Sequence, residues 1–297
     1  MTSAGDGRLR VGVAGLGRMG RPMAGNLAAA GLLVGIHNRT SEVGKRVADE
    51  LEVASYPTPA ELASVADVIV TSVADAGAVR DLYAGEAGFV ETMRPGALAV
   101  EMSTVGPGAV EWLHRLLEAR DCSVVDAPVS GSVSLAEKGE LTIMAGGADE
   151  DVERAMPVLL AIGAKVFHLG PVGSGATMKL AVNNIIYALN QSVAESLVLA
   201  EKAGIDRLRA YEVFAESAIA APFVHYRREL FERPGEAPVA MRLTLEEKDL
   251  ELILELAAGL DARLPQAKVN ATVAREAALA GFGDDDISAV AEYLRRG

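Results

Sequence analysis

The chain has 297 residues and a formal net charge of −13; half of its residues are hydrophobic and only 4% are aromatic. This length favours two domains, and the negative charge, which no basic stripe interrupts, excludes nucleic acid and anionic membranes as expected partners. No run of about 18 apolar residues predicts a membrane span, and the polar segment Met1 to Arg10 lacks the apolar centre of a secretion signal, so a cytoplasmic location is expected.

The N-terminal part of the chain alternates short β-rich runs with helical patterns. The expected strands are Leu9 to Ala14, Leu33 to His37, Val68 to Thr71, Ala97 to Glu101 and Ser123 to Asp126. This alternation predicts an α/β fold with a doubly wound parallel sheet of the Rossmann type. Two more strands, Leu141 to Ala145 and Lys165 to Leu169, are expected to extend the sheet, where mixed strand directions are allowed. A helix over Glu150 to Ile162 is expected between them.

Beyond Gly170 the pattern becomes helical throughout. Helices are expected over Ala176 to Ala203, Asp206 to Glu216, Thr244 to Gly259 and Gln266 to Ala280. The glycines and the proline of Gly170 to Gly175 interrupt both periodicities. We therefore predict an α/β domain over residues 1–170 and an all-helical domain over residues 171–297.

A glycine-rich turn follows the first expected strand and opens a helix over Met19 to Ala30. In this strand-turn-helix context, the spacing of Gly15, Gly17 and Gly20 is typical of dinucleotide binding rather than of a plain turn. Gly15 permits the turn, Gly17 lets the backbone approach the pyrophosphate, and Gly20 lets the helix pack on the strand. The expected cofactor-binding residues of this turn are Gly15, Leu16, Gly17, Arg18, Met19 and Gly20.

The second strand ends at Asn38-Arg39-Thr40, where a fold that prefers NAD usually carries a carboxylate for the ribose hydroxyls. Arg39 can instead pair with a 2′-phosphate, and Asn38 and Thr40 can add hydrogen bonds. The alternative is an ordinary solvated arginine. We predict that the cofactor is NADP rather than NAD.

Three later segments carry polar residues at the ends of expected strands or at the start of a helix: Glu101 to Thr104, Asp126 to Gly131, and Gly173 to Asn183. In an open α/β sheet such positions border the ligand crevice. Lys179 and Asn183 are four residues apart, so they share one helix face in an otherwise apolar pattern. Taken alone, the pair is better explained by a surface lysine and a locally bonded asparagine.

Over nearly its whole length, the sequence resembles the beta-hydroxyacid dehydrogenase family, which includes 3-hydroxyisobutyrate dehydrogenases and semialdehyde reductases. The resemblance rests on four ordered motifs: Gly15 to Gly20, Asp126 to Gly131 continuing through Gly139 to Gly147, Lys179 with Asn183 and Asn184, and Lys248-Asp249. It implies a Rossmann domain joined by a long helix to a helical domain, an active site in the cleft between them, and a homo-dimer or tetramer.

The resemblance also implies roles for single residues. Lys179 corresponds to the catalytic lysine and Asn183 to its helping asparagine. Lys248 corresponds to a further lysine of the cleft, expected near both substrate and cofactor, although it also fits an ordinary charged helix surface. The loops that hold the substrate carboxylate correspond to Ser103, Thr104, Ser130 and Gly131. A lysine ammonium suits the reduction of an aldehyde because it supplies a proton and a positive charge to the developing alkoxide.

The chain departs from the family at Ser132, where many members carry a second glycine. A side chain therefore enters the carboxylate loop, and we count Ser132 among the substrate-binding residues while leaving the substrate open. The expected substrate is a small carbonyl compound or hydroxy acid.

Other functions remain as alternatives. Imine reductases share the architecture but generally lack a lysine at the position of Lys179, and a 6-phosphogluconate dehydrogenase would need a longer helical C-terminal region. A non-catalytic NADP-binding sensor would not need Lys179, Asn183 and the Ser130 loop together. The four histidines and Cys122 show no metal-ligand spacing, so no metal is proposed, and Cys122 is expected to be an inert core thiol.

Overall fold

The computed structural model describes residues 9–296. The prediction for the segment Met1 to Arg10 therefore lies almost entirely outside the described residues. The chain divides into two compact units, Met1–Lys179 and Leu180–Gly297. Each unit has a hydrophobic core of its own.

Unit 1 is built on a six-stranded sheet in the order β3-β2-β1-β4-β5-β6, and every neighbouring pair is parallel. The strands are β1 Val11–Ala14, β2 Leu33–His37, β3 Ala54–Ser55, β4 Val68–Thr71, β5 Leu98–Glu101 and β6 Ser123–Asp126. From β1 the chain continues to β2 and β3 on one side of the sheet, and it then crosses to β4, β5 and β6 on the other side of β1. Ligands bind at such a switch point, outside the carboxyl ends of the strands. The predicted Rossmann sheet is confirmed.

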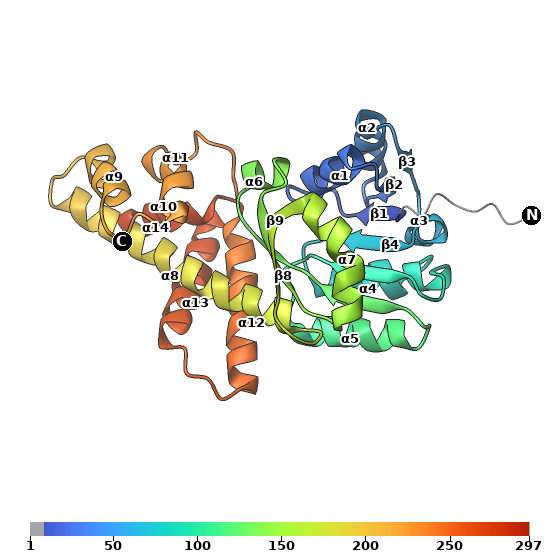
Figure 1. Ribbon diagram of the computed structural model, residues 1–297. Coiled ribbons are helices and arrows are strands. Elements are labelled where there is room, and N and C mark those ends of the chain that lie inside the picture. Colours follow the sequence, from blue (N-terminus) through green and yellow to red (C-terminus); the bar gives the residue numbers. More distant parts are fainter. Residues whose placement is uncertain (1–8, 297) are drawn as a thin grey trace, which may run out of the picture. The chain divides into compact units, whose positions relative to one another are not determined.

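Side chains of successive strand residues point to opposite faces of this sheet. Val68 and Val70 lie in one buried cluster, whereas Ile69 lies in another. Helices cover both faces, as Figure 1 shows. They are α1 Gly20–Ala29, α2 Ser41–Leu51, α3 Pro59–Val65, α4 Ala76–Ala84, α5 Pro107–Glu118 and α7 Asp149–Ile162, with a short turn η1 Phe89–Glu91. Burial on both faces explains why these strands are continuous apolar runs.

The last strands of unit 1 do not extend the six-stranded sheet, so that part of the prediction is wrong. β7 Val129–Ser130, β8 Leu141–Ala145 and β9 Gly163–His168 form a separate three-stranded sheet. β8 pairs antiparallel with β7 and parallel with β9, which accounts for the mixed directions. An isolated bridge, Asp126 with Gly146, links the two sheets. The short helix α6 Val133–Glu137 follows β7.

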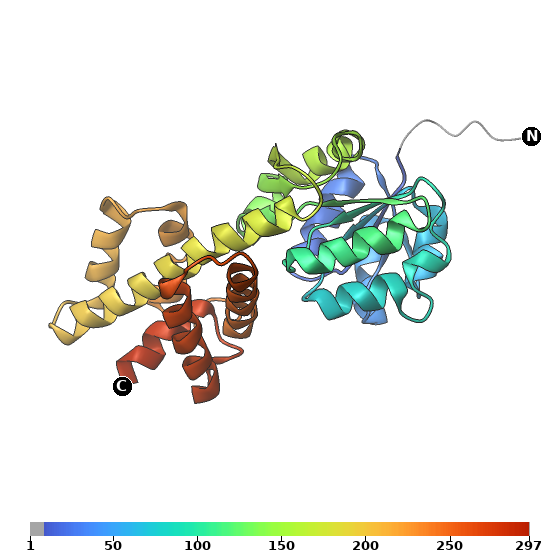
Figure 2. The same ribbon diagram turned by 90° about the horizontal axis from the view of Figure 1, so that it is seen from below.

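Unit 2 is helical throughout its described residues, as predicted. Its helices are α9 Arg207–Glu216, α10 Pro222–Tyr226, α11 Arg228–Glu232, α12 Leu243–Gly259, α13 Pro265–Ala277, η2 Ala278–Phe282, η3 Ile287–Ala289 and α14 Val290–Arg296. Helix α8, Ser174–Lys202, starts in unit 1 and continues into unit 2. Figure 2 shows it in yellow as one uninterrupted helix.

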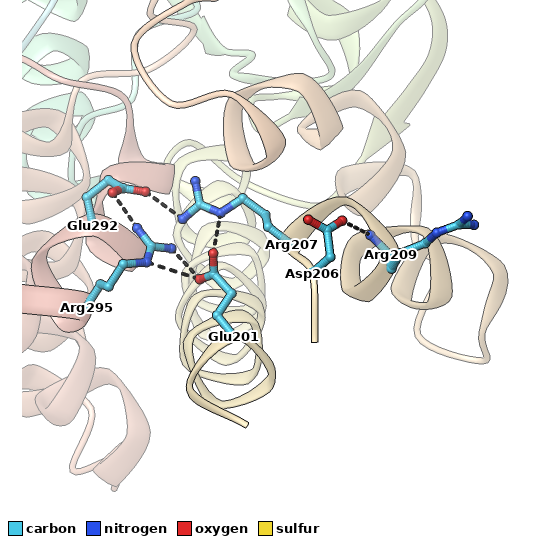
Figure 3. A network of polar contacts seen from close by, with 6 residues as sticks. All are labelled: Glu201, Asp206, Arg207, Arg209, Glu292 and Arg295. Carbon is cyan, nitrogen blue, oxygen red and sulfur yellow. Dashed lines mark hydrogen bonds and ion pairs between the residues drawn. The ribbon is translucent and has the colours of Figure 1, made fainter. Parts of the chain in front are cut away.

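Ion pairs fasten the C-terminal helix of unit 2. Glu201 at the end of α8 accepts hydrogen bonds from Arg207 of α9 and Arg295 of α14, and Glu292 of α14 accepts from the same two arginines. Figure 3 shows this closed ring of four side chains. All four are at least two-thirds buried, with side-chain exposures of 14% to 29%.

Candidate active site

The three glycines after β1 differ in whether the surrounding chain leaves room for a side chain. Gly15 has a φ of +88°, and a Cβ there would lie 2.2 Å from the carbonyl oxygen of Ser72. A Cβ on Gly20 would lie 1.9 Å from the carbonyl oxygen of Gly15. Around Gly17, by contrast, nothing lies within 4 Å of a built Cβ. Gly15 and Gly20 are therefore needed for chain packing, whereas Gly17 leaves open space. That space is what a pyrophosphate approaching the backbone needs.

The start of α1 adds favourable electrostatics at the same place. Met19 caps the helix without a side-chain hydrogen bond, and the first turn carries no acidic residue. Amide groups at a helix N-terminus attract anions. The glycine turn and the helix start thus fit the phosphates of a dinucleotide.

Asn38 connects the glycine turn to the end of β2. Its Oδ1 accepts the backbone N–H of Leu16 at 3.0 Å, and its Nδ2 donates to the carbonyl oxygen of Thr40 at 3.0 Å. Both polar ends of the side chain are therefore engaged within the protein. Thr40, the N-cap of α2, forms no side-chain capping bond.

A cavity of about 150 Å³ lies directly beyond Asn38. Its lining consists of Asn38, Arg39, Ser41, Lys45, Ser55, Tyr56 and Pro57. Arg39 and Lys45 bring two positive charges to it, and Ser41 brings a hydroxyl group; these are suitable ligands for a phosphate monoester. Lys45 and Tyr56 were missed from the sequence. Lys45 had a signal, because it lies one helical turn after Ser41 and so shares its face.

Ser103 lies in a buried polar cluster after β5. Its N–H donates to Glu101 Oε1 at 2.8 Å, its Oγ accepts the N–H of Val73 at 2.8 Å, and Thr71 donates to the same Glu101 carboxyl. Burial raises the pKa of Glu101. The cluster fixes the loop Glu101 to Thr104. Thr104 is half-buried.

The loop after β7 exposes its backbone. Gly131 has a φ of +146°, and a Cβ there would approach Leu141 to 2.7 Å, so glycine is required. Ser130 and Ser132 are half-buried. Ser132 caps α6: its hydroxyl accepts the N–H of Leu135 at 3.3 Å and bonds Ser134 at 2.7 Å. The serine at position 132, where many members of the resembling family carry glycine, thus has a local structural role as the N-cap of α6.

The Asp126 carboxylate anchors the segment that leads into α8. It accepts the N–H groups of Gly173 at 2.8 Å and of Ala176 at 2.7 Å. Burial raises the pKa of Asp126 to about 6, although these backbone hydrogen bonds favour its charged form. Gly175 has no room for a side chain here, since a Cβ would lie 2.2 Å from the carbonyl oxygen of Met144.

Within α8, Lys179 is half-buried and Asn183 lies one turn further on, with only 4% of its surface exposed. Asn183 donates to Asp249 Oδ2 at 2.8 Å and to the hydroxyl of Tyr187 at 3.1 Å. The Nζ atom of Lys248 lies 2.9 Å from Asp249 Oδ1. The structure therefore brings Asn183 and Lys248 to the same carboxylate. Asp249 and Tyr187 were not predicted as site residues, although Tyr187 continues the spacing of four from Lys179 and Asn183.

Two family models together match most of the chain. The first, described as the NAD binding domain of 6-phosphogluconate dehydrogenase, matches residues 10–170. The second, described as the NAD-binding domain of NADP-dependent 3-hydroxyisobutyrate dehydrogenase, matches residues 173–294. The chain belongs to the beta-hydroxyacid dehydrogenase family.

Curated relatives of known activity are similar over almost their full length. The 2-(hydroxymethyl)glutarate dehydrogenase of Eubacterium barkeri is 32% identical over 95% of this chain and 93% of its own. The 3-sulfolactaldehyde reductase of Escherichia coli is 32% identical over 95% of this chain and 94% of its own. A solved structure of 3-hydroxyisobutyrate dehydrogenase from Salmonella typhimurium has a TM-score of 0.87 at 28% identity, over 96% of this chain and 99% of that one.

This beta-hydroxyacid dehydrogenase is thus an NAD(P)-dependent oxidoreductase of hydroxyl or aldehyde groups. Imine reductase structures, such as that of Myxococcus stipitatus, have a TM-score of 0.65 at 18% identity over 96% of this chain and 99% of theirs, which shows the fold alone. Within residues 9–296, no helix is long and apolar enough to cross a membrane. The same residues contain no cluster of three or more histidine, cysteine, aspartate or glutamate side chains suited to a metal ion.

Proposed function

We propose that this enzyme uses NADP to interconvert a small β-hydroxy acid and its semialdehyde, with Lys179 as the proton donor in the reduction. The observation that carries the proposal is the fixed amide of Asn183. It is buried, held by Asp249 at 2.8 Å, and lies one helical turn after Lys179. A surface lysine followed by a locally bonded asparagine would not need such a support.

The residues divide the chemistry among them. When bound, the nicotinamide supplies the hydride that reduces the carbonyl carbon. Lys179 donates a proton from its ammonium group to the oxygen as negative charge develops there, so an alcohol and an uncharged lysine result. Asn183 orients the oxygen-bearing group of the substrate. In the oxidation, uncharged Lys179 takes the proton back.

The substrate carboxylate is assigned to five residues, Ser103, Thr104, Ser130, Gly131 and Ser132. Hydroxyl and backbone N–H donors hold a carboxylate without adding another ionisable group. The relatives support an anionic substrate, because their names denote a glutarate and a sulfonated aldehyde. Lys248, which lies adjacent to Asp249, is assigned to the anionic substrate as a positive charge.

We assign the 2′-phosphate of NADP to the cavity beyond β2. Arg39 and Lys45 line it, and none of its seven lining residues is acidic. Two cations attract the dianionic phosphate, and Tyr56 offers an aromatic face to the adenine. Leu16, Arg18, Asn38 and Thr40 complete the proposed cofactor site. The cytoplasmic location and a homo-dimer or tetramer also remain proposals.

The test is a plate assay of NADPH and NADH oxidation with short aldehydes, with and without a carboxylate or sulfonate, and with cyclic imines. The expected result is turnover of the anionic aldehydes with NADPH. Turnover of imines alone would establish an imine reductase instead. NADPH binding by fluorescence without any turnover would establish a sensor and contradict the assignment of Lys179.

A further inference from the structure

A buried tyrosine joins the Asn183 and Asp249 side chains. The Tyr187 hydroxyl donates to Asp249 Oδ2 at 2.5 Å and accepts a hydrogen bond from Asn183 Nδ2 at 3.1 Å. Asn183 Nδ2 also donates to Asp249 Oδ2 at 2.8 Å. Tyr187 is 0% exposed, and Asn183 and Asp249 are 4% and 2% exposed. The three side chains form a closed hydrogen-bonded triangle inside unit 2.

The triangle determines which way the Asn183 amide faces. An ionised carboxylate only accepts hydrogen bonds, so the Asn183 atom next to Asp249 is the NH₂ group and not the oxygen. One of its two hydrogens goes to Asp249 and the other to the Tyr187 oxygen. The hydrogen of Tyr187 goes to Asp249. Every donor of the triangle is used, and the amide oxygen of Asn183 is the group that remains for a ligand.

The surroundings keep the triangle in this protonation state. Burial and the charge of Asp249 raise the pKa of Tyr187 well above its usual value, so its hydroxyl keeps the proton that it donates. Burial likewise raises the pKa of Glu246, one turn before Asp249 on α12, which disfavours a second negative charge beside Asp249. Lys248, 2.9 Å from Asp249 Oδ1, balances the charge of Asp249.

We propose that Tyr187 is a positioning residue which, together with Asp249, makes Asn183 a hydrogen-bond acceptor in the active site. Asn183 then accepts a hydrogen bond at the reaction centre, from the ammonium group that forms on Lys179 as the hydroxyl proton is transferred or from another donor of the ligand, and it cannot bind the carbonyl oxygen of the aldehyde, which does not donate. The inference rests on the proposed function. It adds a residue to the reaction machinery and gives Asn183 a defined polarity.

Tyr187→Phe removes the hydroxyl and leaves the ring. Without it, one Asn183 hydrogen loses its partner and the amide can rotate. We expect kcat for oxidation of the hydroxy acid to fall about tenfold, which corresponds to one orienting hydrogen bond. The KM for NADP should stay unchanged.

The matched control is Tyr211→Phe. Tyr211 is equally buried in unit 2, and its hydroxyl donates to the backbone carbonyl of Val224 at 2.8 Å. Its kcat should match that of the parent, even if both variants lose thermal stability.

A double-mutant comparison separates positioning from general damage. In the Asn183→Ala background, Tyr187→Phe should change kcat by less than about twofold, because the amide that it orients is gone. A parent-like kcat in Tyr187→Phe, or an undiminished effect of the mutation in the Asn183→Ala background, would overturn the inference. A parent enzyme that turns over no hydroxy acid or aldehyde would overturn the proposed function instead.

NMR of the parent tests the triangle without any activity. Both side-chain amide protons of Asn183, assigned by their loss in Asn183→Ala, should exchange with solvent at least about tenfold more slowly than in an unfolded peptide. In Tyr187→Phe, one of the two should become faster. Two rapidly exchanging protons in the parent would refute the assignment of Asn183 as an acceptor, whatever the kinetics show.

Discussion

Asp126 and Gly173 are 47 positions apart, yet the carboxylate of the first accepts the backbone N–H of the second at 2.8 Å. Asp126 ends β6 and Gly173 immediately precedes α8, so the hydrogen bond ties the sheet of unit 1 to the segment that leads to Lys179. The same carboxylate accepts the N–H of Ala176 at 2.7 Å. The start of α8 is therefore held by a buried carboxyl group.

The buried carboxyl group of Asp126 should make the free energy of unfolding depend on pH. Burial raises the pKa of Asp126 from 3.8 to about 6 in the folded protein, so between these values the folded state binds the proton more tightly than the unfolded state. The tighter proton binding adds about 3 kcal/mol to the free energy of unfolding below about pH 4, and this stabilisation is lost as the pH rises through about 6.

In urea titrations, we expect the stability of the parent relative to Asp126→Asn to fall between about pH 4 and pH 6. The exposed residue Asp49, replaced by Asn, is the control, and a difference between the parent and Asp126→Asn that is constant with pH would contradict the argument.

Gly17→Ala should separate ligand binding from folding. Since nothing lies within 4 Å of a Cβ at this position, the free energy of unfolding should change by less than about 1 kcal/mol. NADPH binding should weaken at least about tenfold, because the methyl group occupies the space of the pyrophosphate. Gly20→Ala is the contrast: its Cβ would meet a backbone oxygen at 1.9 Å, so the fold itself should be destabilised. Calorimetry and fluorescence titration measure the two effects, and unimpaired NADPH binding by Gly17→Ala would contradict the cofactor site.

Arg39→Ala should lower kcat/KM for NADPH about tenfold to a hundredfold and leave that for NADH nearly unchanged. Lys45→Ala should act in the same direction, more weakly. Both side chains line the cavity beyond β2, whereas Arg46, the next residue of α2, does not. Arg46→Ala is thus a matched control of equal charge change. Steady-state kinetics with both cofactors measure these effects. A parent enzyme that prefers NADH would refute the assignment of the 2′-phosphate to this cavity.

Lys179→Ala should reduce kcat about a hundredfold to ten-thousandfold while the affinity for NADPH stays nearly unchanged. The loss is confined to the transition state because the phosphates are assigned to the glycine turn and to Arg39. Lys202→Ala, at the exposed end of the same helix, should have no effect on kcat. Single-turnover oxidation of NADPH is the measurement. A rate for Lys179→Ala within a few-fold of the parent would exclude Lys179 as the proton donor.

The closed ring of Figure 3 should stabilise unit 2 measurably. Glu201 binds two arginines that are largely buried, Arg207 and Arg295, so Glu201→Gln should lower the free energy of unfolding by about 1–2 kcal/mol. The exposed pair of Arg209 and Glu212 gives the comparison, and Glu212→Gln should cost less than about 0.5 kcal/mol. Equal costs in urea unfolding would show that closing the ring adds nothing.

Much of the fold could be predicted because its signals are local. The strands Leu33–His37, Val68–Thr71, Ser123–Asp126 and Leu141–Ala145 have the predicted bounds, since each is a short β-rich run between turns. β3 and β7, of two residues each, are too short to show a pattern. The pairing of β8 with β7 could not be predicted either, because the choice of a neighbour depends on contacts between distant segments.

The same distinction applies to the site. The glycine turn lies in one contiguous motif, and Lys179 and Asn183 share a helix, so their proximity follows from the helical repeat. Tyr187 and Asp249 are 62 positions apart and on different helices. No periodicity connects them. Their hydrogen bond is a product of the packing of α8 against α12, which only the structure describes.

The double engagement of Asn38 has a bearing on how cofactor preference can evolve. The N–H of Leu16 requires an oxygen at that position, and Asn38 Oδ1 provides it at 3.0 Å. An aspartate would provide the same oxygen, but it would turn its second carboxylate oxygen towards the carbonyl oxygen of Thr40, to which Asn38 now donates at 3.0 Å. The residue type that selects NAD in other dinucleotide-binding folds could therefore serve the glycine turn of this one only if the backbone at Thr40 moved away. A change of cofactor would thus involve the start of α2 as well as Arg39 and Lys45.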